Sequence, residues 1–99
     1  MERGNLFSSL ECFISPQSKQ IYYDETKKKV EDVLFENGCM IHSFFNEFVT
    51  LIILTEEEYI PFIEKYPDYQ FLPCVTPHWI LHSILNETML SFVFLFLFQ

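Results

Sequence analysis

The sequence predicts a single three-layer α/β domain, in which a four-stranded, mostly parallel sheet lies between helices. Short apolar runs alternate with segments of helical periodicity in the order β-α-β-β-α-β-α. The run at residues 49–54 is continuously apolar except for Thr50, which is typical of a strand covered on both faces. Strands joined through helices pair in parallel by right-handed crossovers, with helices on both faces. The 99 residues, 49% of them hydrophobic, suffice for one core.

The first strand is predicted at residues 10–14, followed by a loop over 15–23. A helix is then expected from Asp24, a suitable N-cap, with lysines and acids paired along its solvent face. Its apolar stripe comprises Val30, Val33 and Leu34. Gly38 can adopt the left-handed conformation that ends a helix. The sequence therefore predicts a first helix that ends at Gly38.

The middle of the chain predicts two further strands and a second helix. The strands are expected at 39–43 and 49–54, and the aromatic loop between them contains Phe44 and Phe45. Thr55 can cap a helix over residues 56–65, whose first turn carries three glutamates where the helix dipole favours negative charge. Pro61 lies inside this helix and should shorten or kink it.

The last strand is predicted at residues 71–75, and the last helix at 77–87. Pro73 indicates that the strand lies at a sheet edge, because proline cannot donate to a ladder. Thr76 can cap the helix with its hydroxyl, and Pro77 is well placed at the first helical position. Trp79, the single tryptophan, should then enter the core.

The stretch Val75-Thr76-Pro77-x-Trp79-Ile80, with Ser83, resembles the end of a BRCT domain, a small module typical of DNA-damage and repair proteins. The resemblance extends over residues 6–90, and Gly38, Thr50, Pro77 and Trp79 are the residues expected to define the fold. It implies a sheet ordered 2-1-3-4 with three flanking helices. The first and last helices would pack on one face and the second helix on the other.

The resemblance also implies where a phosphate pocket would lie, and this chain departs from it. In BRCT domains that read phosphopeptides, a Ser/Thr hydroxyl, a glycine N–H and a lysine bind the phosphate. Ser15 matches the hydroxyl, but Pro16 replaces the glycine and has no N–H. Glu56 and Glu58, at the start of the second helix, put carboxylates where a cation is needed. We therefore expect a degenerate pocket that does not read phosphoserine.

Other functional classes receive little support from the sequence. The net charge of −8 makes direct nucleic-acid binding unfavourable, and we expect residues 27–29, three lysines with acidic neighbours, to form a solvated helix face. Cys74, His78 and His82 have metal-ligand chemistry but no fourth ligand nearby, so we expect no metal site. We find no catalytic constellation and expect neither enzymatic activity nor a cofactor.

We therefore expect a protein–protein interaction module of a nuclear DNA-repair protein, with cytoplasm as an alternative location. Its partner would be a protein or a second BRCT domain, held through Phe44 and Phe45. The alternative is a non-catalytic domain appended to a DNA-processing or ADP-ribosylating enzyme. The apolar residues 91–99 are too few to span a bilayer and are expected to lie outside the core, as a truncated or alternative end. The alternative interpretation of this segment is an extra edge strand or a strand that docks a partner.

Overall fold

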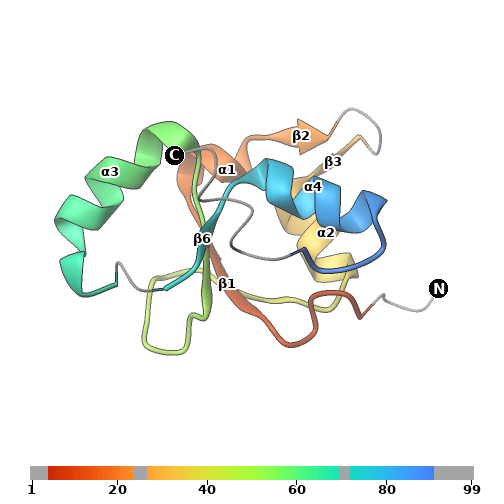
Figure 1. The fold of residues 1–99 in the computed structure, drawn as a ribbon, viewed down its shortest axis with the longest axis horizontal. Helices are drawn as coiled ribbons and strands as arrows, with labels where there is room; N and C mark the ends of the chain where they lie inside the picture. Colours follow the sequence, from red (N-terminus) through yellow and green to blue (C-terminus); the bar gives the residue numbers. More distant parts are fainter. Residues whose placement is uncertain (1–4, 24–26, 70–71, 91–99) are drawn as a thin grey trace.

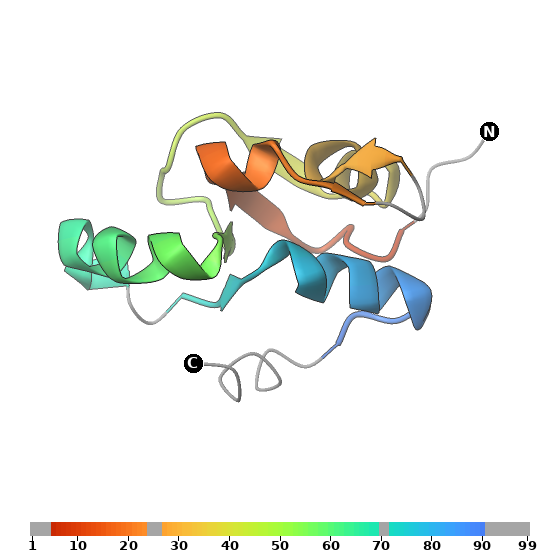
Figure 2. The ribbon, with the colours of Figure 1, turned by 90° about the horizontal axis from the view of Figure 1, so that it is seen from above.

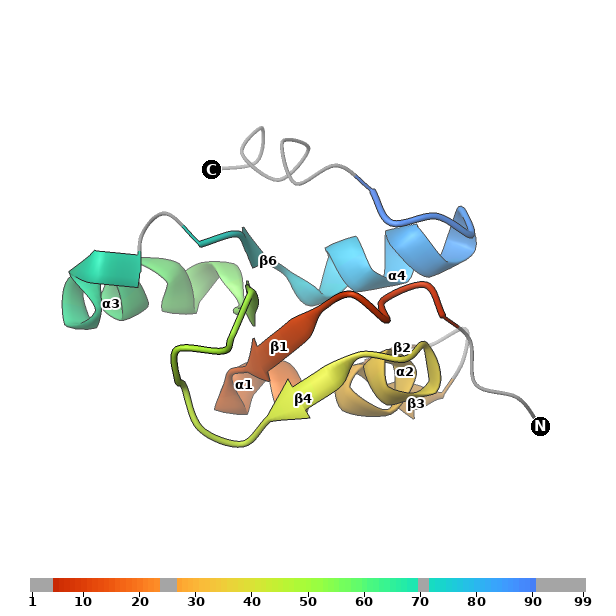
Figure 3. The same ribbon diagram turned by 90° about the horizontal axis from the view of Figure 1, so that it is seen from below.

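A four-stranded parallel sheet runs through the middle of the molecule (Figure 1). The computed structural model describes residues 5–23, 27–69 and 72–90. The strands are β1 (Glu11–Ile14), β4 (Met40–His42), β5 (Leu51–Ile53) and β6 (Cys74–Val75). Figure 3 shows them from β4 through β1 to β6, and their spatial order is β4-β1-β5-β6. This confirms the predicted 2-1-3-4 order, because β4, β1, β5 and β6 are the second, first, third and fourth predicted strands.

Helices cover both faces of the sheet, as the resemblance implies. On one face lie α2 (Val30–Glu36) and α4 (Pro77–Leu85), and on the other lies α3 (Glu56–Lys65), followed by the short 3-10 helix η1 (Pro67–Tyr69). Figures 1 and 2 show α3 well apart from α2 and α4. Within the described residues, no helix is long and apolar enough to cross a membrane.

Two hydrophobic cores fill the spaces between sheet and helices. The larger core contains Trp79, which is 1% exposed and whose ring centroid lies 5.9 Å from that of Phe7. The smaller core forms around Val49, Ile52 and Leu54 beneath α3. Leu51 and Ile53 face the larger core while Ile52, between them, faces the smaller one, so β5 is buried on both sides as predicted.

The segment between β1 and α2 differs from the prediction. A one-turn helix α1 (Pro16–Lys19) begins where a loop was expected, and an antiparallel pair of short strands, β2 (Tyr22–Tyr23) and β3 (Lys28–Lys29), precedes α2. The first long helix therefore begins at Val30 rather than at Asp24, which lies outside the described residues.

The left-handed backbone of Lys27, with φ of 56°, explains why the predicted helix cannot include this segment. Lys28 and Lys29 therefore lie on a strand and not on a helix face, so the helical interpretation of the lysine run is wrong. Lys28 instead pairs with Glu36 at 2.7 Å. Charge spacing alone supports a helix here, but before Val30 the segment has no apolar stripe to hold a helix on the core.

The end of α2 confirms the role of Gly38. Its φ is 89°, and the N–H of Cys39 donates to the carbonyl of Leu34 at 3.0 Å, while that of Gly38 donates to Phe35 at 3.1 Å. These two bonds form a Schellman motif, which satisfies the last carbonyls of the helix.

Three further expectations concern helix starts and prolines. Pro77 is the first residue of α4 and Thr76 is its N-cap, but no hydrogen bond from the helix reaches the Thr76 hydroxyl, and the Trp79 N–H donates to the Thr76 carbonyl instead. Helix α3 continues past Pro61 to Lys65, so Pro61 does not shorten it. Pro73 precedes β6, which is an edge strand as predicted.

Thr50 contributes to the fold through its hydroxyl. The N–H of Glu11, at the start of β1, donates to Thr50 Oγ1 at 3.0 Å, and the Thr50 N–H donates to the Glu11 carbonyl at 2.8 Å. The side chain and backbone of Thr50 thus align the beginnings of β1 and β5.

Candidate functional site

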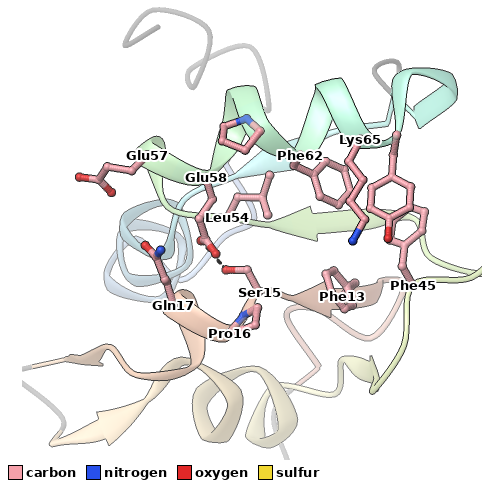
Figure 4. Close-up of a pocket in the computed structure, with 12 residues that line it drawn as sticks. Phe13, Ser15, Pro16, Gln17, Phe45, Leu54, Glu57, Glu58, Phe62 and Lys65 are labelled. Atoms are coloured by element: carbon pink, nitrogen blue, oxygen red, sulfur yellow. Dashed lines mark hydrogen bonds between the residues drawn. The ribbon is translucent and has the colours of Figure 1, made fainter.

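A groove of about 370 Å³ lies between the end of β1 and helix α3 (Figure 4). One end is polar and the other is aromatic. The groove is lined by Phe13, Ser15, Pro16, Gln17, Phe45, Leu54, Glu57, Glu58, Pro61, Phe62, Lys65 and Tyr66. Pockets for small ligands usually occupy about 300–1,000 Å³, so this groove can accommodate one or two side chains of a partner.

The polar end is organised around a contact between Ser15 and Glu58. Ser15 is buried directly after β1, where its N–H donates to the carbonyl of Ile53 at 3.0 Å. Its hydroxyl donates to Glu58 Oε1 at 2.5 Å and accepts from the N–H of Ser18 at 3.1 Å as the N-cap of α1. The single hydroxyl proton of Ser15 is therefore already used within the domain.

The carboxylate of Glu58 is held in place by the start of its own helix. Its Oε1 accepts hydrogen bonds from the N–H of Thr55 at 2.8 Å and from the Thr55 hydroxyl at 2.9 Å. This is a capping-box arrangement, in which a glutamate three residues into the helix satisfies the N-cap residue. Local helix chemistry thus holds a negative charge against Ser15.

The structure brings together three of the four residues predicted for the degenerate phosphate pocket. Ser15, Pro16 and Glu58 line the groove, whereas Glu56 does not, and Glu57 lines it instead. Pro16 is the first residue of α1, where it has no N–H to offer a ligand. The Ser15 end of the groove consequently presents carboxylates and an engaged hydroxyl.

The aromatic end is built around Phe45. Its ring centroid lies 5.7 Å from that of Phe13, 5.6 Å from that of Phe62 and 5.6 Å from that of Tyr66. Lys65 extends over the Tyr66 ring, with Nζ 5.3 Å from the centroid. Sequence reasoning missed this cluster, because its members come from β1, a loop and α3.

Phe44 and Phe45, the two residues predicted for a partner surface, lie in different surroundings. Phe44 is 81% exposed, whereas Phe45 is half-buried within the aromatic end of the groove. Asn46 orders the loop that carries them, since its Nδ2 donates to the Phe44 carbonyl at 3.0 Å and its Oδ1 accepts from the Phe48 N–H at 2.8 Å. Phe44 is thus available to a partner directly, and Phe45 only as part of the groove.

The residues considered for a metal site do not come together. His78 and His82 are exposed on α4, and Cys74 is half-buried on β6. Across the described parts of the chain, no group of three or more His, Cys, Asp or Glu side chains has the arrangement to hold a metal ion.

Two other cysteines form a contact that the sequence analysis did not predict. Cys12 and Cys39 are buried, with their sulfur atoms 2.8 Å apart. The hydrogen bond with Cys39, reinforced by burial, raises the pKa of the Cys12 thiol, and the same bond lowers the pKa of Cys39. The 2-1-3-4 order that the resemblance implies makes the first two strands neighbours, so this order could have indicated the contact.

Of the comparisons with known proteins, the one with solved structures identifies the fold. No family model matches the sequence, and no curated protein matches it. Among solved structures, the BRCT domain from human DNA repair protein REV1 superposes with a TM-score of 0.64 and 17% identity, covering 96% of this chain and 90% of that one.

Two further solved structures come from XRCC1. The C-terminal BRCT domain of human XRCC1 matches with a TM-score of 0.64 and 15% identity, covering 95% of this chain and 94% of that one. A crystal structure of the second XRCC1 BRCT domain matches with a TM-score of 0.64 and 16% identity, covering 95% and 91%. The order of the sheet, the helices on its two faces and these superpositions agree: the chain has the fold of a BRCT domain.

Proposed function

We propose that this domain is a protein–protein interaction module of a nuclear DNA-repair protein and that it holds its partner without reading phosphoserine. Support for the repair context comes from the fold, which this chain shares with a domain of a protein described as a DNA repair protein. Partner candidates are another protein or a second BRCT domain. We assign no catalytic step to the domain.

The contact between Ser15 and Glu58 is the observation that carries the phosphate-independent part of the proposal. A phosphate needs N–H or hydroxyl donors and preferably a cation. Here the Ser15 hydroxyl already donates to a carboxylate at 2.5 Å, and Pro16 has no N–H. A phosphate would have to displace the Glu58 carboxylate and would also be repelled by it.

Charge also argues for a protein partner over DNA. With a net charge of −8 the chain repels the phosphates of a duplex, which supply most of the affinity in non-specific DNA binding. The alternative function is that of a non-catalytic domain appended to a DNA-processing or ADP-ribosylating enzyme, and such a domain would use the same docking surface. A catalytic region encoded next to this domain would favour this alternative.

The test is affinity capture from nuclear extract with the full 99-residue chain, with and without phosphatase treatment of the extract. We expect a partner identified by mass spectrometry to persist after phosphatase treatment. In parallel, a randomised phosphoserine peptide library should show no enrichment over its unphosphorylated counterpart. Partners that disappear after phosphatase treatment, or phosphoserine peptides whose binding is lost in Ser15→Ala, would overturn the proposal.

A further inference from the structure

We infer that the groove between α1 and α3 binds a segment of a partner protein that carries an arginine or lysine beside a large apolar side chain. This inference rests on the proposed function and names the chemistry of the partner. The basic side chain would lie at the Ser15–Glu58 end, and the apolar one at the Phe45 end.

The polar end has acceptor atoms that the domain itself does not use. The hydrogen bonds that Glu58 accepts from Ser15 and Thr55 all end on Oε1. Its Oε2 has no hydrogen-bond partner among the described residues, and Glu57, also at this end, is exposed. Two carboxylates with acceptor capacity therefore line the same end, which is the environment that a guanidinium or ammonium group requires.

Pro61 adds to the acceptor character of this wall. In a regular helix the N–H of residue 61 would donate to the carbonyl of Glu57, but proline has no N–H. The Glu57 carbonyl thus lacks its usual helical donor beside the groove that both residues line. A cationic side chain can supply such a donor.

The aromatic end provides the anchor for an apolar side chain. Leu54 is buried, and the rings of Phe13, Phe45 and Phe62 lie on the side of it that is away from Glu58 in Figure 4. Burying an apolar side chain against such a surface contributes about 25 cal/mol per Å² of area removed from water. Lys65 gives this end a positive charge, so the groove is negative at one end and positive at the other, which fixes the order in which it accepts the two side chains.

The distribution of charge along the groove also argues against an acidic or phosphorylated segment as the ligand. An acidic or phosphorylated side chain at the Ser15 end would face the Glu58 carboxylate, with Glu57 also lining this end, and the lysine that lines the groove lies at the far, aromatic end. Charge complementarity therefore selects a basic segment over an acidic one.

The experiment uses fluorescein-labelled peptides in a glycine–serine background and the full 99-residue chain, with binding followed by fluorescence anisotropy. Each peptide carries one arginine and one phenylalanine, at varied spacing and in both orders. Matched peptides replace the arginine by glutamate or by phosphoserine, or the phenylalanine by serine. We expect each replacement to weaken binding of the best peptide about tenfold, and higher salt to weaken it further.

Protein variants identify the groove as the binding site. Glu57→Gln combined with Glu58→Gln should weaken binding about tenfold, and glutamine at position 58 retains the capping oxygen. The matched control, Glu31→Gln with Asp32→Asn, removes the same charge from exposed positions on α2 and should leave the affinity unchanged. Equal loss in both double variants would mean general electrostatic attraction and would overturn the inference.

The remaining outcomes separate this inference from the proposed function. If no arginine peptide binds better than the plain glycine–serine peptide while the full chain still captures a phosphatase-insensitive partner, the inference is wrong and the proposed function stands. If the phosphoserine peptide binds best and Ser15→Ala abolishes its binding, both are wrong.

Discussion

The hydroxyl of Tyr23 donates a hydrogen bond of 2.5 Å to the backbone carbonyl of Pro77, across 54 positions of the sequence. This contact joins the β2–β3 hairpin to the first residue of α4, in the stretch that carries Trp79. Tyr23 is 4% exposed, so the bond is made in the protein interior. The hydrogen bond thus connects the β2–β3 hairpin, which was not predicted from the sequence, to the stretch around Trp79 that resembles the BRCT family.

We expect Tyr23→Phe to lower the free energy of unfolding by about 1–3 kcal/mol, because the Pro77 carbonyl is left without this donor in a buried position. Urea denaturation followed by circular dichroism measures the change. Tyr22→Phe is the matched control, since Tyr22 is 59% exposed, and it should change stability by less than about 0.5 kcal/mol. Equal effects of the two variants would contradict the role given to the buried bond.

The same residue predicts how stability depends on alkaline pH. Burial raises the pKa of the Tyr23 hydroxyl above its ordinary value. The folded protein therefore holds this proton more tightly than the unfolded chain, so the contribution is complete below pH ~10 and decreases as pH rises above it. Urea midpoints measured between pH 8 and pH 11 should fall less steeply in Tyr23→Phe than in the parent protein. Parallel curves would argue against the prediction.

Phe45 and Phe44 offer a test of which aromatic residue stabilises the domain and which is free to bind. Phe45→Ala removes the centre of a four-ring cluster and should cost about 2–4 kcal/mol of stability. Phe44→Ala removes a ring that is 81% exposed and should cost less than about 0.5 kcal/mol. Thermal denaturation of both variants checks the stabilities.

Capture of the phosphatase-insensitive partner then tests the proposed contact of Phe44. A folded Phe44→Ala variant that loses this partner would place Phe44 on the docking surface. Full retention of the partner would remove Phe44 from that surface and leave the groove as the binding region.

Trp79 should behave as both a core residue and a probe. Because it is the single tryptophan and is 1% exposed, its fluorescence should be blue-shifted in the folded state and shift to the red on unfolding. Trp79→Phe should lower stability by about 1–3 kcal/mol through the space it leaves beside Phe7. Leu85→Ala, on the exposed side of the same helix, should have a smaller effect in urea denaturation. A larger loss in Leu85→Ala would be inconsistent with this packing.

Cysteine reactivity should report on burial of the thiols. Burial raises the pKa of Cys74 from 9.0 to about 11, which reduces the thiolate fraction at pH 8 by about 100-fold. We expect iodoacetamide to label Cys74 slowly in the folded protein, faster as pH approaches 11, and quickly once urea unfolds the chain. Peptide mass spectrometry distinguishes Cys74 from the two fully buried cysteines, and rapid labelling of Cys74 at pH 8 in the folded protein would contradict the prediction.

Local patterns in the sequence were sufficient for most of the secondary structure. The apolar run around Ile52 predicts a strand buried on both faces, Gly38 ends a helix in the left-handed conformation, and Pro77 starts one. Each of these depends on a residue and its near neighbours, through propensity, periodicity or a fixed backbone angle. The order 2-1-3-4 came from the resemblance of the Trp79 stretch to a known family.

Tertiary structure alone decided the features that depend on distant residues. The lysine run has helical charge spacing, yet Lys28 and Lys29 pair with Tyr22 and Tyr23 in a hairpin whose Tyr23 is buried against α4. Local charge pairs contribute only a few tenths of a kcal/mol each, so packing prevails over them. The different surroundings of Phe44 and Phe45 depend in the same way on which ring meets α3.

In the candidate site, too, some features could be predicted from the sequence and others depend on the tertiary structure. The resemblance to BRCT domains indicated where a phosphate pocket would lie, at Ser15, Pro16, Glu56 and Glu58, and the donors and acceptors of these residue types then indicated that the pocket lacks phosphate donors. Only the folded chain, by placing residues 43 positions apart in contact, made Glu58 the acceptor of the Ser15 hydroxyl and set both beside an aromatic groove. The sequence by itself determined which hydrogen-bond donors and acceptors each residue has. The packing of α3 against the sheet decided which of these residues are in contact.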